Sequence, residues 1–238
     1  MPSLEVLEDN RGLVRAIVVS LWVYCGFVII TLLLNAYLIY LYSSDFQYNL
    51  FEYIAIEDSH YILFAILNFL SLLAFGIMYI VYFKRVYSNA RYIGNEELDL
   101  SEGMVVGMWF IPLYNLVKPY LASKQVYQIL KEHLSKKNII QEDKYKVSIV
   151  AFWWFGWVLT NILSRIPNRD YDSEIPEVFV QGASIELVFS SLEIIALVIA
   201  FKYIKELVEL DSLNYKYYQE RALYGDFSEE TIFEDDDV

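Results

Sequence analysis

Residues 16–42 read AIVVSLWVYCGFVIITLLLNAYLIYLY and contain no charged side chain. A helix needs about 20 apolar residues to cross the roughly 30 Å hydrocarbon layer of a membrane. Three later stretches are similarly apolar, at residues 61–83, 147–164 and 183–204. Only the fourth contains carboxylates, Glu186 and Glu193. The pattern predicts an all-α membrane protein with four transmembrane helices.

The composition of the whole chain agrees with this fold class. It is 57% hydrophobic, whereas a soluble domain is about 45–50% apolar. The net charge is −13, but much of it comes from the acidic residues 226–238. We expect residues 1–225 to form one four-helix transmembrane domain and residues 226–238 an acidic tail. The tail is either solvated and disordered, or docked through Ile232 and Phe233 onto the basic loop between the second and third spans.

The distribution of basic residues predicts the orientation of these helices. Sixteen of the 18 Lys and Arg residues lie before the first span, between the second and third, or from Lys202 at the inner end of the fourth span onward. Positively charged flanks remain on the cytoplasmic side of a membrane. We therefore expect a multi-pass protein of the cell membrane with both termini in the cytoplasm. The chain has no basic patch with interleaved base-stacking aromatics, so nucleic acid is not an expected partner.

The connections between the spans differ in length. Residues 43–60 and 166–181 are predicted to be short outer connections. The second helix is expected to continue to a stop at Gly94, where glycine reaches left-handed dihedrals, and the fourth to continue to Gly225.

Between the second and third spans, residues 103–120 read GMVVGMWFIPLYNLVKPY. Pro112 interrupts this run, and proline breaks a straight helix because it lacks a backbone donor. The uninterrupted apolar part is also too short to cross the membrane. We expect residues 103–135 to form an interfacial segment or a shallow re-entrant one, closed at Pro119 and followed by an amphipathic helix from Tyr120.

Polar residues inside the spans fall at helical spacing, so each set faces one direction. The sets are Ser20, Tyr24, Thr31 and Asn35; Asn68 and Ser71; Trp157, Asn161 and Ser164; and Glu186, Ser190 and Glu193. One interpretation is hydrogen bonding between helices. The other is a proton or cation pathway through Glu193, Glu186 and Asn161. If Arg165 pairs with Glu186, Glu193 is left with Asn side chains or Tyr hydroxyls.

No catalytic, cofactor or metal site is predicted. His60 and His133 are the only histidines, and they are expected on opposite faces of the membrane. The local signatures of serine hydrolases, zinc proteases, P-loops and dinucleotide-binding folds are all missing from the sequence. We expect a protein that is not an enzyme and carries no cofactor.

Residues 85–94, RVYSNARYIG, and 100–120, LSEGMVVGMWFIPLYNLVKPY, resemble the signature of a bacterial membrane family called domain of unknown function 4328. The matching positions are Arg85, Asn89, Gly94, Ser101, Gly103, Gly107, Trp109, Phe110, Pro112, Asn115, Lys118 and Pro119. Met108 stands where the family pattern has an aromatic residue. The resemblance implies several membrane spans around this motif, and it implies no activity.

The motif also has a physical interpretation. Trp109 and Phe110 suit the headgroup layer, Pro112 breaks the helix, Asn115 caps freed backbone groups, and Lys118, just before Pro119, faces phosphate. The segment is then either a wedge packed under the helices or a platform for anionic lipid headgroups or a protein partner.

Two functions follow from these features. The leading one is a non-enzymatic protein that binds lipids or partners at the cytoplasmic face. The alternative is a small transporter or channel subunit that uses Glu193 and Glu186. The sequence does not decide the oligomeric state.

Overall fold

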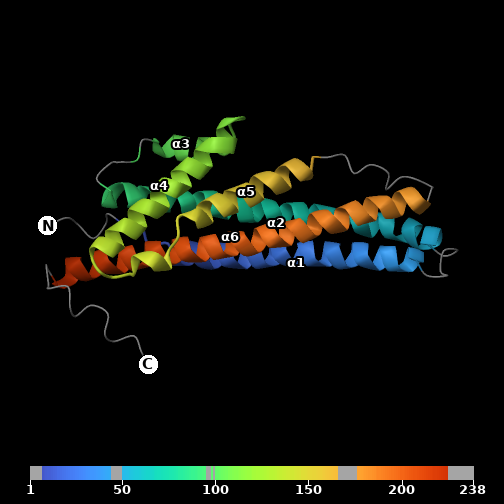
Figure 1. Ribbon diagram of the computed structural model, residues 1–238, viewed down its shortest axis with the longest axis horizontal. Coiled ribbons are helices and arrows are strands. Elements are labelled where there is room, and N and C mark those ends of the chain that lie inside the picture. Colours follow the sequence, from blue (N-terminus) through green and yellow to red (C-terminus); the bar gives the residue numbers. More distant parts are fainter. Residues whose placement is uncertain (1–6, 44–49, 95–97, 99, 166–175, 225–238) are drawn as a thin grey trace, which may run out of the picture. The chain divides into compact units, whose positions relative to one another are not determined.

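The computed structural model describes residues 7–43, 50–94, 98, 100–165 and 176–224, and all secondary structure within them is helical. The helices are α1 (Arg11–Ser43), α2 (Leu50–Ile93), α3 (Glu102–Gly107), α4 (Tyr114–Lys136), a short 3-10 helix (Glu142–Lys144), α5 (Ser148–Leu163) and α6 (Pro176–Tyr224), as Figure 1 shows. The predicted all-α fold is confirmed, with short helices between the second and third long ones. The predicted acidic tail, residues 226–238, lies outside the described residues.

Four helical stretches are long and apolar enough to cross a membrane: Arg11–Tyr37, Leu63–Ile93, Glu142–Leu163 and Val180–Leu223. In the most apolar 18-residue window of each stretch, only 11–22% of the residues are buried. Most of the apolar side chains in these windows are therefore open to the surroundings. Such a surface would cause aggregation in water, whereas lipid tails cover it in a bilayer.

Several helices begin earlier than the sequence predicts. Helix α2 begins at Leu50, within the predicted outer connection at residues 43–60, and α6 begins at Pro176, within the one at 166–181. Hydropathy marks where hydrocarbon ends, but a helix satisfies its own backbone hydrogen bonds in either solvent and need not stop there. Proline is also favoured at the first position of a helix, where its missing N–H costs nothing.

Helix α2 ends at Ile93, next to the predicted stop at Gly94, but not because of left-handed dihedrals at this glycine. A Cβ atom added at Gly94 would lie 3.2 Å from two side-chain carbons of Ile129 in α4 and 3.2 Å from the Ala90 carbonyl oxygen. Gly94 therefore permits a close approach of α4 to the end of α2.

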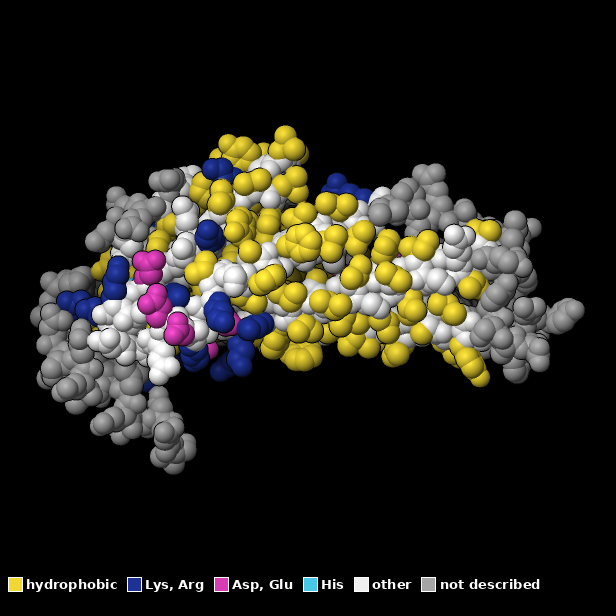
Figure 2. Space-filling model, in the orientation of Figure 1, with side chains coloured by type: hydrophobic (Ala, Val, Ile, Leu, Met, Phe, Trp, Pro, Cys, Tyr) yellow, Lys and Arg dark blue, Asp and Glu magenta, His cyan; other side chains and the backbone are white. Residues whose placement is uncertain are grey.

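The contacts divide the chain into two compact units, and each of the helices α1, α2, α5 and α6 contributes residues to both. Of the residues that the structure describes, unit 1 comprises those within 1–16, 78–152 and 202–238, and unit 2 comprises those within 17–77 and 153–201. On the face drawn in Figure 2, apolar side chains dominate unit 2, while most charged side chains belong to unit 1.

The core of unit 1 combines aliphatic residues of α4 and α6 with an unusual number of tyrosines. Fully buried tyrosines are Tyr82, Tyr127, Tyr145 and Tyr203. The hydroxyl oxygens of Tyr79 and Tyr203 are 3.2 Å apart. Buried tyrosines add large apolar area but need partners for their hydroxyl groups. The core of this unit is therefore partly polar.

Unit 2 is held by aromatic contacts and by one close approach of small residues. The rings of Phe27 and Phe64 are 5.2 Å apart, and those of Trp22 and Phe201 are 5.5 Å apart. A Cβ atom added at Gly156 of α5 would lie 3.2 Å from the Cβ of Ala196 in α6. Close approach at small residues is a usual way for helices to associate in lipid.

Candidate functional site

The chain reverses direction between α3 and α4 in a short apolar turn. Helix α3 begins after Ser101, whose side chain accepts a hydrogen bond from the Met104 N–H at 3.4 Å, and it has only six residues. Leu113, just before α4, has a φ of 66° and a ψ of −41°. A positive φ is costly for any residue with a side chain, and especially for a bulky one. The turn therefore holds a leucine in a strained backbone conformation.

Apolar side chains project from this turn and from the start of α4, and we name residues 110–117 the α3–α4 tip. Phe110 is 72% exposed, Leu113 is 78% exposed and Val117 is 52% exposed. Ile111, Tyr114 and Leu116 are exposed as well. Apolar side chains also gather over α3 and the start of α4 in Figure 2. The tip is thus an apolar surface on unit 1.

Other residues of the predicted interfacial motif take different places. Trp109 packs its ring edgewise against Tyr79 and Phe83 of α2, with centroids 5.6 and 6.1 Å apart, so it points into unit 1 rather than away from it. The Asn115 side chain donates to the Trp109 carbonyl oxygen at 3.4 Å, which ties the start of α4 to the turn. Pro112 is exposed in the turn itself.

Pro119 and Lys118 lie within α4, which begins at Tyr114 and not at Tyr120 as predicted. Pro119 is buried in the early part of this helix, so it does not close the segment. The Lys118 ammonium lies 5.9 Å from the ring centroid of Tyr114, one turn earlier. Among the described residues, Lys118 makes no ion pair with a carboxylate, so its charge is available at the tip.

In unit 2 the structure gives Glu193 a partner from another helix. The Tyr24 hydroxyl of α1 donates to the Glu193 carboxylate of α6. A Tyr hydroxyl is one of the two kinds of neighbour named for Glu193 if Arg165 pairs with Glu186, and that pairing stays a prediction. Glu186 lies near enough to interact electrostatically with Glu193. Asn161, in contrast, donates to the Trp157 carbonyl of its own helix at 2.8 Å. Arg165 is exposed just beyond the end of α5.

Unit 1 contains a buried polar cluster that the sequence analysis did not identify. The Asp211 side chain of α6 accepts hydrogen bonds from the Asn10 amide at 2.9 Å and from the Asn89 amide at 3.0 Å. Asn89 also accepts from the Glu8 N–H at 2.8 Å, and its amide donates to the Glu8 carbonyl at 3.2 Å. These bonds join residues 8–10 to α2 and α6.

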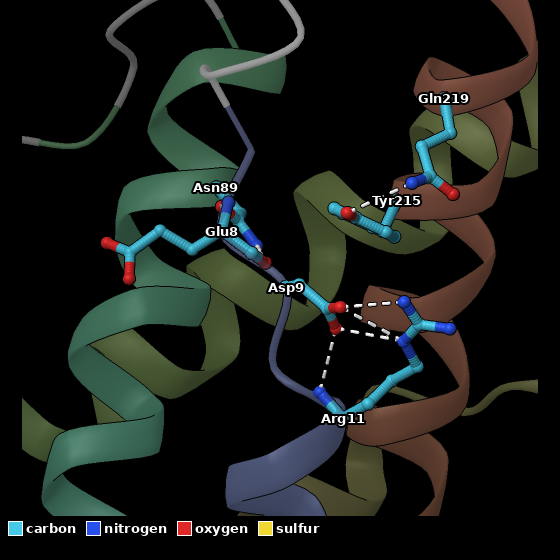
Figure 3. Close-up of polar contacts among 6 residues, drawn as sticks. All are labelled: Glu8, Asp9, Arg11, Asn89, Tyr215 and Gln219. Carbon is cyan, nitrogen blue, oxygen red and sulfur yellow. Dashed lines mark hydrogen bonds and ion pairs between the residues drawn. The ribbon is translucent and has the colours of Figure 1, made fainter.

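Two exposed ion pairs flank this cluster. Asp9 lies against Arg11, with a carboxylate oxygen 2.8 Å from a guanidinium nitrogen, and Figure 3 shows the two side chains facing each other. The Arg11 side chain lowers the pKa of the Asp9 carboxyl by hydrogen bonding to its charged form. The Glu8 carboxylate is 3.0 Å from Arg85. On α6, the Gln219 amide donates to the Tyr215 hydroxyl at 3.1 Å.

A second polar contact joins α4 to α6 through His133 and Asn214. The Asn214 amide nitrogen donates to the carbonyl oxygens of Leu130 at 3.1 Å and Leu210 at 2.8 Å. Its side-chain oxygen is therefore an acceptor, and the His133 Nδ1 atom, 2.7 Å away, must be the donor. This arrangement assigns the Nδ1–H tautomer to a neutral His133.

The surroundings of His133 favour its neutral form. Burial lowers the pKa of the His133 imidazole, and the charges of Lys137, Lys136 and Arg221 act in the same direction. The Tyr218 hydroxyl lies 3.4 Å from Nε2, and the Tyr218 ring stacks on the imidazole.

A sequence signal for the missed cluster does exist. Asp211 and Asn214 lie at the helical spacing of the buried Ile204 and Leu207, in positions where an apolar residue is expected. A polar residue at a core position indicates a buried partner. The partners of Asp211, Asn10 and Asn89, lie on segments distant in the sequence, so only the structure identifies them.

These observations define the class of the protein. Four long apolar helices with mostly exposed apolar surfaces make it a multi-pass membrane protein. A family model described as "Domain of unknown function (DUF4328)" matches residues 50–209, which is more than half of the chain, so the chain belongs to this family. No curated protein and no solved structure matches it.

Proposed function

We propose that this is a non-enzymatic protein of the cell membrane that binds anionic lipid headgroups at the cytoplasmic face through the α3–α4 tip. Both termini are in the cytoplasm in this proposal. The asymmetry of Lys and Arg along the sequence supports the orientation. The proposal that it is not an enzyme rests on the missing catalytic signatures in the sequence.

The observation that carries the proposal is Leu113 at the α3–α4 tip. Its side chain is 78% exposed although its backbone is strained, and glycine would relieve that strain. Strained residues persist where their conformation serves a function. An exposed leucine gains nothing in water, but gains free energy when it enters the acyl boundary of a membrane.

The basic side chains of α4 supply the charge for the headgroup. Lys118 lies one turn from Tyr114 at the tip, and Lys124 follows on the same helix. Basic residues near a membrane surface attract anionic lipids, at about 1 kcal/mol per residue. An apolar tip with adjacent lysines is therefore suited to an anionic lipid surface.

The test measures how deeply the α3–α4 tip enters the membrane. A spin label is attached at residue 113 of a Cys25→Ser background, and the full chain is placed in liposomes with and without anionic phosphatidylglycerol. We expect the label to collide more with lipid-soluble oxygen than with a water-soluble nickel complex. The anionic lipid should strengthen this preference, and Lys118→Gln should reduce the effect of the anionic lipid.

A matched label at Gln125, an exposed polar position on α4, serves as the control and should report water. A label at residue 113 that is equally accessible to the water-soluble reagent would contradict the proposal. Protection from both reagents would also contradict it, because it would indicate a protein partner or internal packing in place of lipid.

A second candidate function is favoured by the contact between Tyr24 and Glu193. A carboxyl group held by a hydroxyl inside a span, with Glu186 nearby, is the type of site found along proton and ion pathways. In proteoliposomes, Glu193→Gln should reduce proton or cation flux if the pathway exists. Flux at the level of protein-free liposomes in the unmodified protein would eliminate this candidate.

A further inference from the structure

The buried carboxyl group of Asp211 has no cationic partner among the residues that the structure describes. Asp211 is 4% exposed, and its two hydrogen-bond donors, Asn10 and Asn89, are neutral amides. Neutral donors leave a negative charge uncompensated, and a buried uncompensated charge is strongly unfavourable. Asp211 therefore needs either a proton or a cation, and the described side chains supply no cation.

Near this carboxyl group, two buried oxygen atoms have no hydrogen-bond partner among the described residues. One is the side-chain oxygen of Asn10, whose amide nitrogen already donates to Asp211. The other is the hydroxyl oxygen of Tyr82, which is 0% exposed and close enough to Asp211 for a direct electrostatic interaction. Buried polar atoms are normally satisfied, so both oxygens point to a ligand.

The nearby charges also favour a cation. Glu8 and Asp9 both act electrostatically on Asp211 and make the local potential more negative. The neighbouring cations are already engaged, since Arg85 pairs with Glu8 and Arg11 pairs with Asp9. Figure 3 shows Asp9 turned towards Arg11, and Glu8 beside Asn89.

We propose that Asp211, Asn10 and Tyr82 bind one monovalent metal cation, sodium or potassium. Each of the three side chains has an oxygen atom that can serve as a ligand, and oxygen is the donor that hard cations prefer. A single carboxylate balances a single positive charge, whereas sites for divalent ions gather more carboxylates. Within the described part of the chain, no group of three or more His, Cys, Asp or Glu residues forms such a site. The ion links residues 8–10 to α2 and α6.

The test is thermal unfolding of the full chain in detergent micelles. It compares sodium, potassium and N-methyl-D-glucamine chlorides at equal concentration, because the organic cation is too large for a buried site. A ligand that binds only the folded state raises the unfolding midpoint in a saturable way. For a chain of this size we expect about 2–4 °C at roughly five times the dissociation constant. An equal midpoint in all three salts would overturn the proposal.

Variants separate this site from general effects of salt. Asp211→Asn should abolish the difference between the metal cations and N-methyl-D-glucamine. Glu209→Gln removes a carboxylate on the same helix as Asp211, where Glu209 pairs with Lys144. This variant should retain the difference between the metal cations and N-methyl-D-glucamine. Tyr82→Phe removes one oxygen and leaves the ring, so it should require several-fold more metal cation for the same shift.

Tyr82→Phe also keeps the proposal falsifiable if Asp211→Asn does not fold. Because the Tyr82 hydroxyl has no hydrogen-bond partner in the part of the protein that the structure describes, its loss should not lower the midpoint in N-methyl-D-glucamine chloride. A Tyr82→Phe variant with the full response to the metal cation would overturn the assignment of Tyr82 as a ligand and, with it, the proposed site.

Discussion

The His133 side chain makes the stability of the protein depend on pH. Burial keeps the pKa of its imidazole below the ordinary value of 6.5 in the folded state. As the pH falls below this value, the unfolded chain therefore takes up the proton first. The stability that the neutral imidazole contributes is present above pH 6.5 and is lost as the pH falls towards the folded-state pKa. We expect the unfolding midpoint to decrease between about pH 7.5 and 5.5.

His133→Gln provides the comparison, because glutamine keeps an N–H donor for Asn214 and does not titrate. Its unfolding midpoint in detergent should decrease less than that of the unmodified protein over the same pH range. Identical pH dependence in the two proteins would show that other groups cause the effect.

The Tyr24 hydroxyl is expected to stabilise unit 2 through Glu193. Tyr24→Phe should lower the free energy of unfolding by about 0.5–2 kcal/mol, the range measured for side-chain hydrogen bonds between membrane helices. Unfolding in mixed detergent micelles measures the change. Tyr37→Phe is the matched control, because Tyr37 lies on the same helix and is 46% exposed. Equal effects of the two substitutions would argue against a stabilising contact.

At the scale of the elements, the turn before α4 holds Leu113 at a positive φ. Leu113→Ala and Leu113→Gly both remove most of the side chain, but only glycine relieves the positive φ. The glycine variant should be more stable than the alanine variant by about 1 kcal/mol. This value already includes the free-energy cost of the larger conformational entropy that glycine gives the unfolded chain. Chemical unfolding in detergent gives both values.

Leu121 supplies the reverse control, since it is exposed in the interior of α4. There, the Leu121→Gly variant should be less stable than the Leu121→Ala variant by about 1 kcal/mol, because alanine has the higher helix propensity. The same order of stability at both positions would indicate that Leu113 is not strained.

The contact of α5 with α6 depends on the small size of Gly156. A Cβ atom at this position would meet Ala196 at 3.2 Å, whereas one at Gly76 of α2 would have no neighbour within 4 Å. Gly156→Leu should therefore separate the helices and destabilise the protein by about 1–3 kcal/mol. Gly76→Leu should not destabilise the protein, because there is room for the side chain at this position and leucine has a higher helix propensity than glycine. Unfolding in mixed micelles compares the two.

For the molecule as a whole, the proposed orientation places both termini in one compartment. Reporter domains that are active only in the cytoplasm should function at either end of the full chain, because the basic flanks of the spans resist translocation. A reporter that is active at one end only would require an odd number of crossings. It would contradict the four-span topology and also the proposed position of the α3–α4 tip.

Much of the architecture is accessible from the sequence, because lipid imposes a simple rule on composition. Each span needs about 20 apolar residues, and Pro112 marks the break between α3 and α4. The helix ends outside the hydrocarbon, such as those at Leu50 and Pro176, are harder to predict from the sequence. A helix that passes from lipid into water changes the type of its side chains but keeps its backbone hydrogen bonds. A Tyr hydroxyl was one of two kinds of neighbour expected for Glu193 if Arg165 paired with Glu186, because a carboxyl group inside a span needs a partner.

The sequence alone determines that lipid surrounds this chain, because length and hydropathy are local properties that can be counted along it. Contacts between distant segments are a different kind of property, and only the tertiary structure decides them. It turns Trp109 inward, leaves Phe110 and Leu113 exposed, and brings Asn10 to Asp211. A side chain gains or loses free energy according to its neighbours in space, and folding chooses those neighbours from anywhere in the chain.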